Sequence, residues 1–261
     1  MKIGVFDSGL GGLTVVQAIS EVIQGAEIFY VADTLHAPYG EKSFSEILQF
    51  SLNITQYLIE THQIDALVVA CNTATSVAIQ TLRLRYPKLI IIGTEPAVKP
   101  AIEQSKTGKI GVLATPATLK GDKYQSLVDR VVSDKEVMLY EQACPGLVEH
   151  IEANTLRSKK SLMLLEQWLA PMREAGVDII VLGCTHYPLA NKVIQEVMNR
   201  ELILIDSGKA IAKHLKQLLE KNGHHNQGAL AIQLFHTGEI NPQIVYDILK
   251  KPMVLNALDG L

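Results

Sequence analysis

Short apolar runs alternate with longer segments of helical periodicity along most of the chain, and this alternation predicts an α/β fold. The expected strands are residues 3–6, 27–32, 66–70, 89–93, 110–114, 136–140, 177–183, 202–205 and 230–235. Most of these runs lack polar alternate residues, which is typical of parallel strands buried on both faces. We therefore expect mostly parallel sheets with helices packed on both sides.

The helical spacing of apolar residues places the connecting segments. The expected helices are residues 13–23, 43–61, 77–86, 161–175 and 211–219, with shorter ones after Thr118, after Leu189 and after the last strand. The long second helix carries a start signal, because Ser43 and Glu46 have the spacing of a capping box.

The second half of the chain repeats the pattern of the first. When residues 177–192 are laid on residues 64–79, Cys184 falls on Cys71. The same offset relates residues 202–207 to residues 89–94, and a similar one relates residues 109–112 to residues 2–5. Three matches in the same order predict two related α/β halves.

Pro96 and Pro100 interrupt the pattern and mark the crossing into a second domain. We expect a first domain of residues 1–97 plus 207–261 and a second of residues 98–206. The expected architecture is two pseudo-symmetric three-layer α/β domains whose mostly parallel sheets face a central cleft.

A cysteine follows the matching strand in each half. Ligands of open α/β sheets bind outside the carboxyl ends of the strands, so Cys71 and Cys184 lie where chemistry usually occurs in such folds. A single cysteine there is more simply a small buried apolar residue. The repeat favours the functional interpretation, because facing halves would bring two thiols to one site. Cys144 has no counterpart in the repeat and is expected to be structural.

Composition excludes several classes of protein. The chain has 261 residues, 48% of them hydrophobic, and a formal net charge of −3, so it offers no basic face for nucleic acid. No apolar run approaches the length of a membrane span, and the start of the chain does not resemble a signal peptide. Three cysteines without an export signal predict reduced thiols in the cytoplasm.

The motifs present favour neither a nucleotide nor a metal. The glycine-rich turn at residues 7–12 lacks the third glycine of a dinucleotide fingerprint, and no Walker lysine follows it. Free amides at the start of the next helix would instead suit a carboxylate, although Asp7 alone could simply be a helix cap. Cys184 and His186 are too few to suggest a zinc site. We predict no metal and no cofactor.

Two thiols on either side of a small molecule suit proton transfer at a stereocentre. One base removes a proton from one face of the carbon, and the opposite acid returns a proton to the other face. A nearby histidine or helix start favours the thiolate, and both cysteines precede an expected helix. Disulfide exchange is the rival use of two thiols, but the chain lacks a CxxC motif. A Cys–His hydrolase would leave the repeat unexplained.

With these motifs assembled, the chain resembles the glutamate racemases of the aspartate/glutamate racemase family over nearly its whole length. The matching motifs are Asp7-Ser8-Gly9, Pro38-Tyr39-Gly40 with Lys42-Ser43, Cys71-Asn72-Thr73, Cys144-Pro145 leading to Glu152, Cys184-Thr185-His186 and Asp206-Ser207-Gly208. The resemblance implies two α/β domains around a cleft, cofactor-independent racemisation of glutamate, and often a homodimer. It also implies supply of D-glutamate for peptidoglycan.

The resemblance also implies roles for individual residues. Cys71 would act on D-glutamate with help from Asp7, and Cys184 would act on L-glutamate with help from His186 and Glu152. The positions that match substrate-binding residues are Asp7, Ser8, Tyr39, Gly40, Asn72, Thr73, Thr185 and His186.

One segment departs from the family's common spelling. The residues between Cys144 and Glu152 contain less Phe and Pro than is usual. Glu152 rather than Glu149 keeps the family spacing, and Glu149 stays the alternative for the carboxylate beside Cys184. Two other functions stay open from the sequence. One is a racemase for aspartate or another amino acid, and the other is a non-catalytic amino-acid-binding protein of the same fold.

Overall fold

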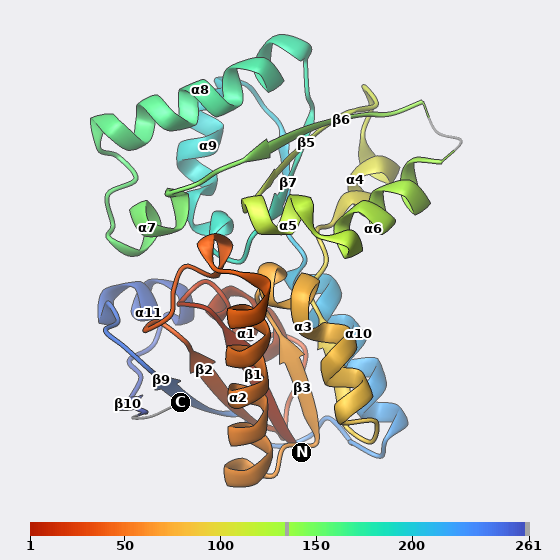
Figure 1. The fold of residues 1–261 in the computed structure, drawn as a ribbon, viewed down its shortest axis with the longest axis vertical. Coiled ribbons are helices and arrows are strands. Elements are labelled where there is room, and N and C mark those ends of the chain that lie inside the picture. The colour runs from red at the N-terminus through yellow and green to blue at the C-terminus, as the bar shows by residue number, and fades with distance from the viewer. Residues whose placement is uncertain (134–135, 259–261) are drawn as a thin grey trace. The chain divides into compact units, whose positions relative to one another are not determined.

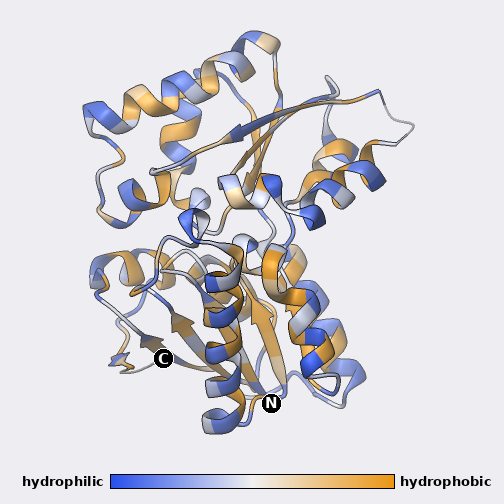
Figure 2. Ribbon diagram, viewed as in Figure 1, coloured by the Kyte–Doolittle hydropathy of each residue, from blue (hydrophilic) through white to orange (hydrophobic). Residues whose placement is uncertain are grey.

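The computed structural model describes residues 1–133 and 136–258, which form two compact units. Unit 1 comprises Met1–Thr94 and the C-terminal segment from Gly208 onward, and unit 2 comprises Glu95–Ser207. Figure 1 shows that a sheet lies between helices in each, and Figure 2 shows that the strands are mainly hydrophobic while polar residues lie on the outer helix faces.

Unit 1 contains a parallel sheet of six strands in the order β10-β9-β2-β1-β3-β4. The strands are β1 (Lys2–Asp7), β2 (Glu27–Ala32), β3 (Ala66–Val69), β4 (Ile90–Gly93), β9 (Ala231–His236) and β10 (Leu255–Ala257). Every strand pairing recorded in this sheet is parallel, and strands β2, β1 and β3 are buried almost throughout. This matches the apolar runs of the sequence, because a strand covered on both faces has no polar side.

Helices cover both faces of the unit 1 sheet. On one face α2 (Phe44–His62) packs beside α3 (Asn72–Arg85), and on the other α1 (Leu13–Ser20) packs against α10 (Gly208–Lys221) and α11 (Pro242–Leu249). The one-turn 3₁₀ helix η1 (Tyr39–Glu41) precedes α2. The predicted capping box at the start of α2 is confirmed, since both of its hydrogen bonds are present.

Unit 2 contains a parallel sheet of four strands in the order β6-β5-β7-β8. The strands are β5 (Lys109–Ala114), β6 (Met138–Ala143), β7 (Ile179–Gly183) and β8 (Ile203–Ile205). The helices are α4 (Val98–Gln104), α5 (Pro116–Lys120), α6 (Asp122–Val132), α7 (Leu147–Glu152), α8 (Lys159–Ala175), η2 (Tyr187–Ala190) and α9 (Asn191–Met198).

Side chains of β7 alternate between two apolar cores, as successive residues of a strand point to opposite faces. Ile180 and Leu182 pack with α7, α8 and α9, whereas Ile179 and Val181 pack with α4 and α6. The central strand is therefore apolar at every position, which explains its continuous run in the sequence.

The predicted repeat is confirmed at the level of topology. The four strands of unit 2 have the order β6-β5-β7-β8, and the first four strands of unit 1 have the corresponding order β2-β1-β3-β4. In unit 1 the chain adds β2 on one side of β1 and then crosses over to add β3 on the other side, so the strand order switches between β1 and β3. The same switch lies between β5 and β7 in unit 2. Ligands of open α/β sheets bind at such switch points, and the chain places a cysteine directly beside each.

Several boundaries differ from the sequence predictions. The helix behind Cys71 begins at Asn72 rather than Val77, because Cys71 itself caps it. Cys184 is not followed directly by an α-helix, since only η2 comes next and α9 begins at Asn191. Helix α4 and strand β10 were not predicted, because seven residues and three residues are too short for periodicity to reveal.

Among the described residues, no helix has both the length and the apolar character needed to cross a membrane. Within the same ranges, His, Cys, Asp and Glu side chains form no group of three or more that could hold a metal ion.

Candidate active site

Cys71 and Ser8 lie side by side at the carboxyl edge of the unit 1 sheet. Strands β1 and β3 are adjacent, and Phe6 pairs with Val69. Ser8 and Cys71 each come two residues later, so they leave the sheet next to each other. The Cys71 thiol lies 3.8 Å from the Ser8 hydroxyl oxygen, within hydrogen-bonding range for sulfur, and both side chains are buried. The strand register therefore positions the predicted thiol beside a predicted substrate-binding hydroxyl.

The sulfur of Cys71 is also the N-terminal cap of α3. The backbone N–H of Ala74 donates a hydrogen bond to the sulfur over 3.4 Å. An amide donor and the positive end of a 14-residue helix both stabilise negative charge on a thiolate. Asn72 and Thr73 form the first turn behind it, and both side chains are buried although polar.

The Asp7 carboxylate is fixed at the end of β1. It is buried, and its Oδ2 accepts a hydrogen bond of 2.6 Å from the backbone N–H of Gly12. Tyr30 also stabilises the turn between Asp7 and Gly12, because its hydroxyl donates to the Gly9 carbonyl at 2.6 Å. Asp7 therefore occupies a turn braced from the neighbouring strand.

Tyr39 is held by a buried carboxylate at the same edge. The Tyr39 hydroxyl donates to Asp33, which also accepts from Thr237 Oγ1 at 2.7 Å and contacts His36 Nδ1 at 2.9 Å. Burial raises the pKa of Tyr39 well above its ordinary value, and the charge and hydrogen bond of Asp33 raise it further. Tyr39 therefore stays a protonated donor, and Gly40 follows it in η1.

Unit 2 carries a chain of three side chains that starts at the second predicted thiol. Cys184 follows β7, and its sulfur lies 3.9 Å from His186 Nδ1. The other ring nitrogen of His186, Nε2, lies 2.7 Å from the Glu152 carboxylate at the end of α7. Thr185 Oγ1 lies 3.5 Å from His186 Nδ1. The carboxylate that contacts His186 is therefore that of Glu152, whereas Glu149 is exposed.

His186 is almost completely buried between a thiol and a carboxylate. Burial alone would lower the pKa of His186, because a buried imidazolium loses its hydration. The hydrogen bonds and charges of Cys184 and Glu152 outweigh burial and raise the pKa of His186 well above its ordinary value. A protonated His186 would stabilise a negatively charged thiolate on Cys184, because the two side chains are neighbours.

Cys144 differs from the other two cysteines. Its thiol is buried and contacts the Gln142 carbonyl at 3.6 Å, and burial raises the pKa of Cys144. A thiol that resists ionisation is a poor acid or base near neutral pH. This geometry agrees with the structural role expected of Cys144.

The predicted site residues thus gather in two groups, one in each unit. Unit 1 brings together Asp7, Ser8, Tyr39, Gly40, Cys71, Asn72 and Thr73 at the ends of β1 and β3 and in η1, and unit 2 brings together Glu152, Cys184, Thr185 and His186.

Known proteins match this chain over most of its length. The sequence model of the Asp/Glu/Hydantoin racemase family matches residues 3–215. A glutamate racemase of Sulfurovum sp. (strain NBC37-1) is 61% identical over 249 residues, covering 95% of this chain and 94% of the relative. The chain belongs to the Asp/Glu/Hydantoin racemase family.

Solved structures of this racemase family have the same architecture. Escherichia coli glutamate racemase, solved with L-glutamate and the activator UDP-MurNAc-ala, has a TM-score of 0.86 at 32% identity, covering 100% of this chain and 98% of that one. The Francisella tularensis enzyme, solved with D-glutamate, has a TM-score of 0.84 at 25% identity, covering 100% and 97%. The predicted α/β fold of two domains with parallel sheets is confirmed.

The structure of this racemase-family chain also reveals supporting residues that the sequence analysis missed. Asp33 and Thr237 hold Tyr39, and Tyr30 holds the turn beside Asp7. Tyr187 is fully buried, and its hydroxyl donates to the Cys144 carbonyl at 3.4 Å. Two of these residues could have been found from their positions in the sequence. Asp33 and Thr237 directly follow β2 and β9, at the edge of the sheet that carries Cys71.

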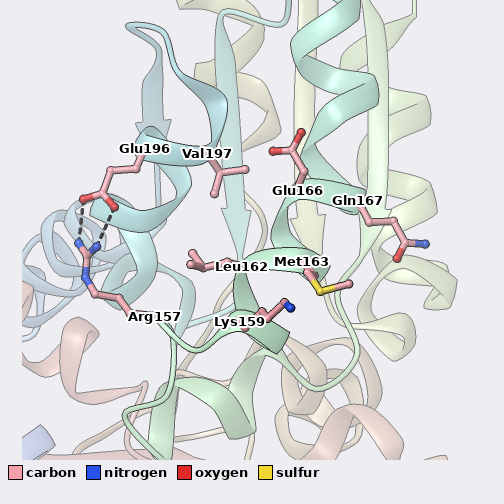
Figure 3. Close-up of a pocket in the computed structure, with 8 residues that line it drawn as sticks. All are labelled: Arg157, Lys159, Leu162, Met163, Glu166, Gln167, Glu196 and Val197. Atoms are coloured by element: carbon pink, nitrogen blue, oxygen red, sulfur yellow. Dashed lines mark hydrogen bonds and ion pairs between the residues drawn. The ribbon is translucent and has the colours of Figure 1, made fainter.

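A separate surface hollow lies in unit 2 beside α8 and α9 (Figure 3). On one side the Arg157 guanidinium donates to the Glu196 carboxylate at 2.9 and 2.7 Å. Leu162 and Met163 of α8 add exposed apolar surface. The residues that line this hollow are distinct from the predicted site residues of this racemase-family chain, so it is not the candidate active site.

Proposed function

We propose that the chain is a glutamate racemase that interconverts L-glutamate and D-glutamate without a cofactor. The matching placement of Cys71 and Cys184 beside the switch points of two related sheets is the observation that carries the proposal. Glutamate is proposed as the substrate because relatives that are 61% and 54% identical to the chain are glutamate racemases.

The reaction needs one base and one acid on opposite faces of Cα. One thiolate takes the Cα proton, so a C–H bond breaks and an S–H bond forms. The opposite thiol gives its proton to the other face of the carbon and becomes a thiolate, so no proton or electron is gained or lost overall. Following the family resemblance, Cys71 deprotonates D-glutamate and Cys184 deprotonates L-glutamate.

Each thiol has its own support for negative charge. Cys71 accepts a hydrogen bond from the Ala74 amide at the start of α3. Cys184 lies beside His186, whose pKa Glu152 helps to raise. These contacts support the roles proposed for His186 and Glu152 as partners of Cys184 and for Cys71 as a stabilised thiolate.

Short polar side chains next to both thiols would bind the carboxylates and the ammonium of glutamate. The proposed substrate-binding residues are Asp7, Ser8, Tyr39, Gly40, Asn72, Thr73, Thr185 and His186. Their support is that all but Gly40 are buried polar groups, and they lie after the carboxyl ends of strands, in the first turn of α3 or in η1, where open α/β sheets bind ligands.

The proposal assigns one thiol to each predicted domain, residues 1–97 plus 207–261 and residues 98–206. Racemisation requires both sulfurs to reach opposite faces of one carbon. In a cell the product would supply D-glutamate for peptidoglycan, as the family resemblance implies. The homodimer and the cytoplasmic location stay predictions.

Single substitutions of the three cysteines test the two-thiol mechanism. Cys71→Ala and Cys184→Ala should each lower racemisation of glutamate by at least about 10³-fold, since each removes an acid or base that nothing nearby replaces. Cys144→Ala is the matched control and should stay active. Turnover near the wild-type rate in either of the first two variants contradicts the mechanism.

A panel of substrates separates the remaining functions. Glutamate should be racemised faster than aspartate and other amino acids, as measured by chiral chromatography. A preference for aspartate would reassign the substrate within the family. Binding of glutamate without any exchange of the Cα hydrogen would instead identify a non-catalytic binding protein.

A further inference from the structure

Tyr30 lies on the opposite side of β2 from the α2–α3 core. Its neighbours Phe29 and Val31 pack in that core, so Tyr30 points to the other face, which α1 covers. The side chain is completely buried, and its hydroxyl donates to the Gly9 carbonyl at 2.6 Å. A strand residue therefore ties down the turn that joins β1 to α1.

Gly12 sits where this turn meets both Tyr30 and Asp7. A Cβ at Gly12 would lie 2.6 Å from the Asp7 Cβ and 2.8 Å from the Tyr30 hydroxyl oxygen. Gly12 has right-handed helical dihedrals, φ −61° and ψ −15°, which any residue adopts. Glycine is therefore needed here for close approach rather than for backbone conformation.

The Gly12 amide completes the arrangement by donating to Asp7 Oδ2 at 2.6 Å. The phenol thus holds the Gly9 carbonyl, and the last residue of the same turn holds the carboxylate. We propose that Tyr30 is a positioning residue for Asp7, acting through the Gly9–Gly12 turn, and through Asp7 for the proton transfer at Cys71. This inference rests on the proposed racemase function.

Primary isotope effects can separate the two proton transfers. When the substrate carries deuterium at Cα, the enzyme removes deuterium from one face and returns a solvent proton to the other. The isotope effect on D-glutamate therefore reports the step at Cys71, and the effect on L-glutamate reports the step at Cys184. A change that slows only the Cys71 step raises the first effect and lowers the second toward unity.

Tyr30→Phe removes the hydroxyl and keeps the shape of the side chain. It should lower kcat about tenfold, because a small displacement of a catalytic group lowers the rate. The isotope effect on D-glutamate should rise and that on L-glutamate should fall. Unchanged isotope effects, or equal changes in both, would overturn the assignment of Tyr30.

Two further variants keep the test decisive. Gly12→Ala crowds both Asp7 and the Tyr30 hydroxyl, so it should also raise the isotope effect on D-glutamate and lower that on L-glutamate. If Tyr30→Phe does not fold, unchanged isotope effects in Gly12→Ala would overturn the proposed link from Tyr30 and this turn to Cys71. Tyr124→Phe is the matched control, because it removes another buried hydroxyl, one that donates to Glu141 in unit 2. It should leave both isotope effects unchanged.

The outcome distinguishes the two proposals. If the wild-type protein does not racemise glutamate, the proposed function fails before Tyr30 is tested. If the wild type racemises glutamate and Tyr30→Phe shows the wild-type isotope effects, only the positioning role of Tyr30 fails.

Discussion

Cys71 and Cys184 hold the same place after equivalent strands but have different neighbours. Cys71 caps a helix and accepts a backbone N–H, while Cys184 lies beside an imidazole that bonds a carboxylate. The repeat therefore conserves the position of each sulfur and varies the means of stabilising its charge. Sequence comparison of the halves predicts the first property, and only the side-chain contacts reveal the second.

The contact between His186 and Glu152 gives a prediction at this scale. Glu152→Gln keeps a hydrogen-bonding side chain but removes its negative charge. Less then opposes the effect of burial, which lowers the pKa of His186, so this pKa should fall. An NMR titration of labelled histidine measures the change. Glu149→Gln, at an exposed position three residues earlier, is the control and should leave the His186 titration unaltered. Equal titrations in all three proteins would contradict the proposed pairing.

The spacing of motifs predicts which residues follow the strands and favours Glu152 over Glu149 beside the histidine, but it does not exclude Glu149. Glu149 and Glu152 lie on the same short helix, and the sequence leaves both open. The choice depends on the rotation of α7 about its axis, which is set by the packing of Leu147, Val148 and Ile151. Such packing is a tertiary property that no local pattern contains.

At the scale of elements, the capping box of α2 offers a test of local stability. Ser43→Ala removes the hydroxyl that accepts from the Glu46 amide at 3.3 Å. The free energy of unfolding should fall by about 1 kcal/mol, as for other capping residues. Urea denaturation measures it, with Thr61→Ala in the exposed last turn of the same helix as control. Similar losses in both variants would count against the cap.

The end of the same helix carries a pH-sensitive contact. His62 stacks on Phe29 with ring centroids 4.1 Å apart, and burial, followed by the charge of Lys2, lowers the pKa of His62 from 6.5. Because the folded state prefers neutral His62, its contribution to stability is present above pH 6.5 and is lost as the pH falls from there through the folded-state pKa.

We therefore expect the stability of the wild type to decline more than that of His62→Gln as the pH falls from about 7.5 to about 5. This interval extends at least about one pH unit on each side of an ordinary histidine pKa. Urea unfolding at several pH values gives the difference. Parallel curves for the two proteins would show that His62 does not contribute.

Elements with strong periodicity could be predicted, and those fixed by tertiary contacts could not. The start of α3 is the clearest case, because Asn72, Thr73, Thr75 and Ser76 show no apolar stripe and favour helices weakly. They are helical because Cys71 caps the turn and the buried Thr75 side chain bonds the Val69 carbonyl at 3.1 Å. A polar first turn thus hides the start of this helix from an analysis of apolar periodicity.

For the whole molecule, the repeat was the most informative feature of the sequence. It predicted two related sheets, and the strand orders β2-β1-β3-β4 and β6-β5-β7-β8 confirm the relation. The repeat could not predict β10, which extends only the first sheet beyond β9. A strand of three residues outside the duplicated part has neither periodicity nor a matching copy to reveal it.

Incubation of L-glutamate in D₂O tests the two-thiol account most directly. Because the proton is returned by a different group from the one that took it, D-glutamate should carry deuterium at Cα from the first turnovers. The remaining L-glutamate should stay protiated at that stage. NMR and chiral chromatography measure both quantities. Absence of D-glutamate and of Cα deuterium would contradict the account, and so would early deuterium in L-glutamate without inversion.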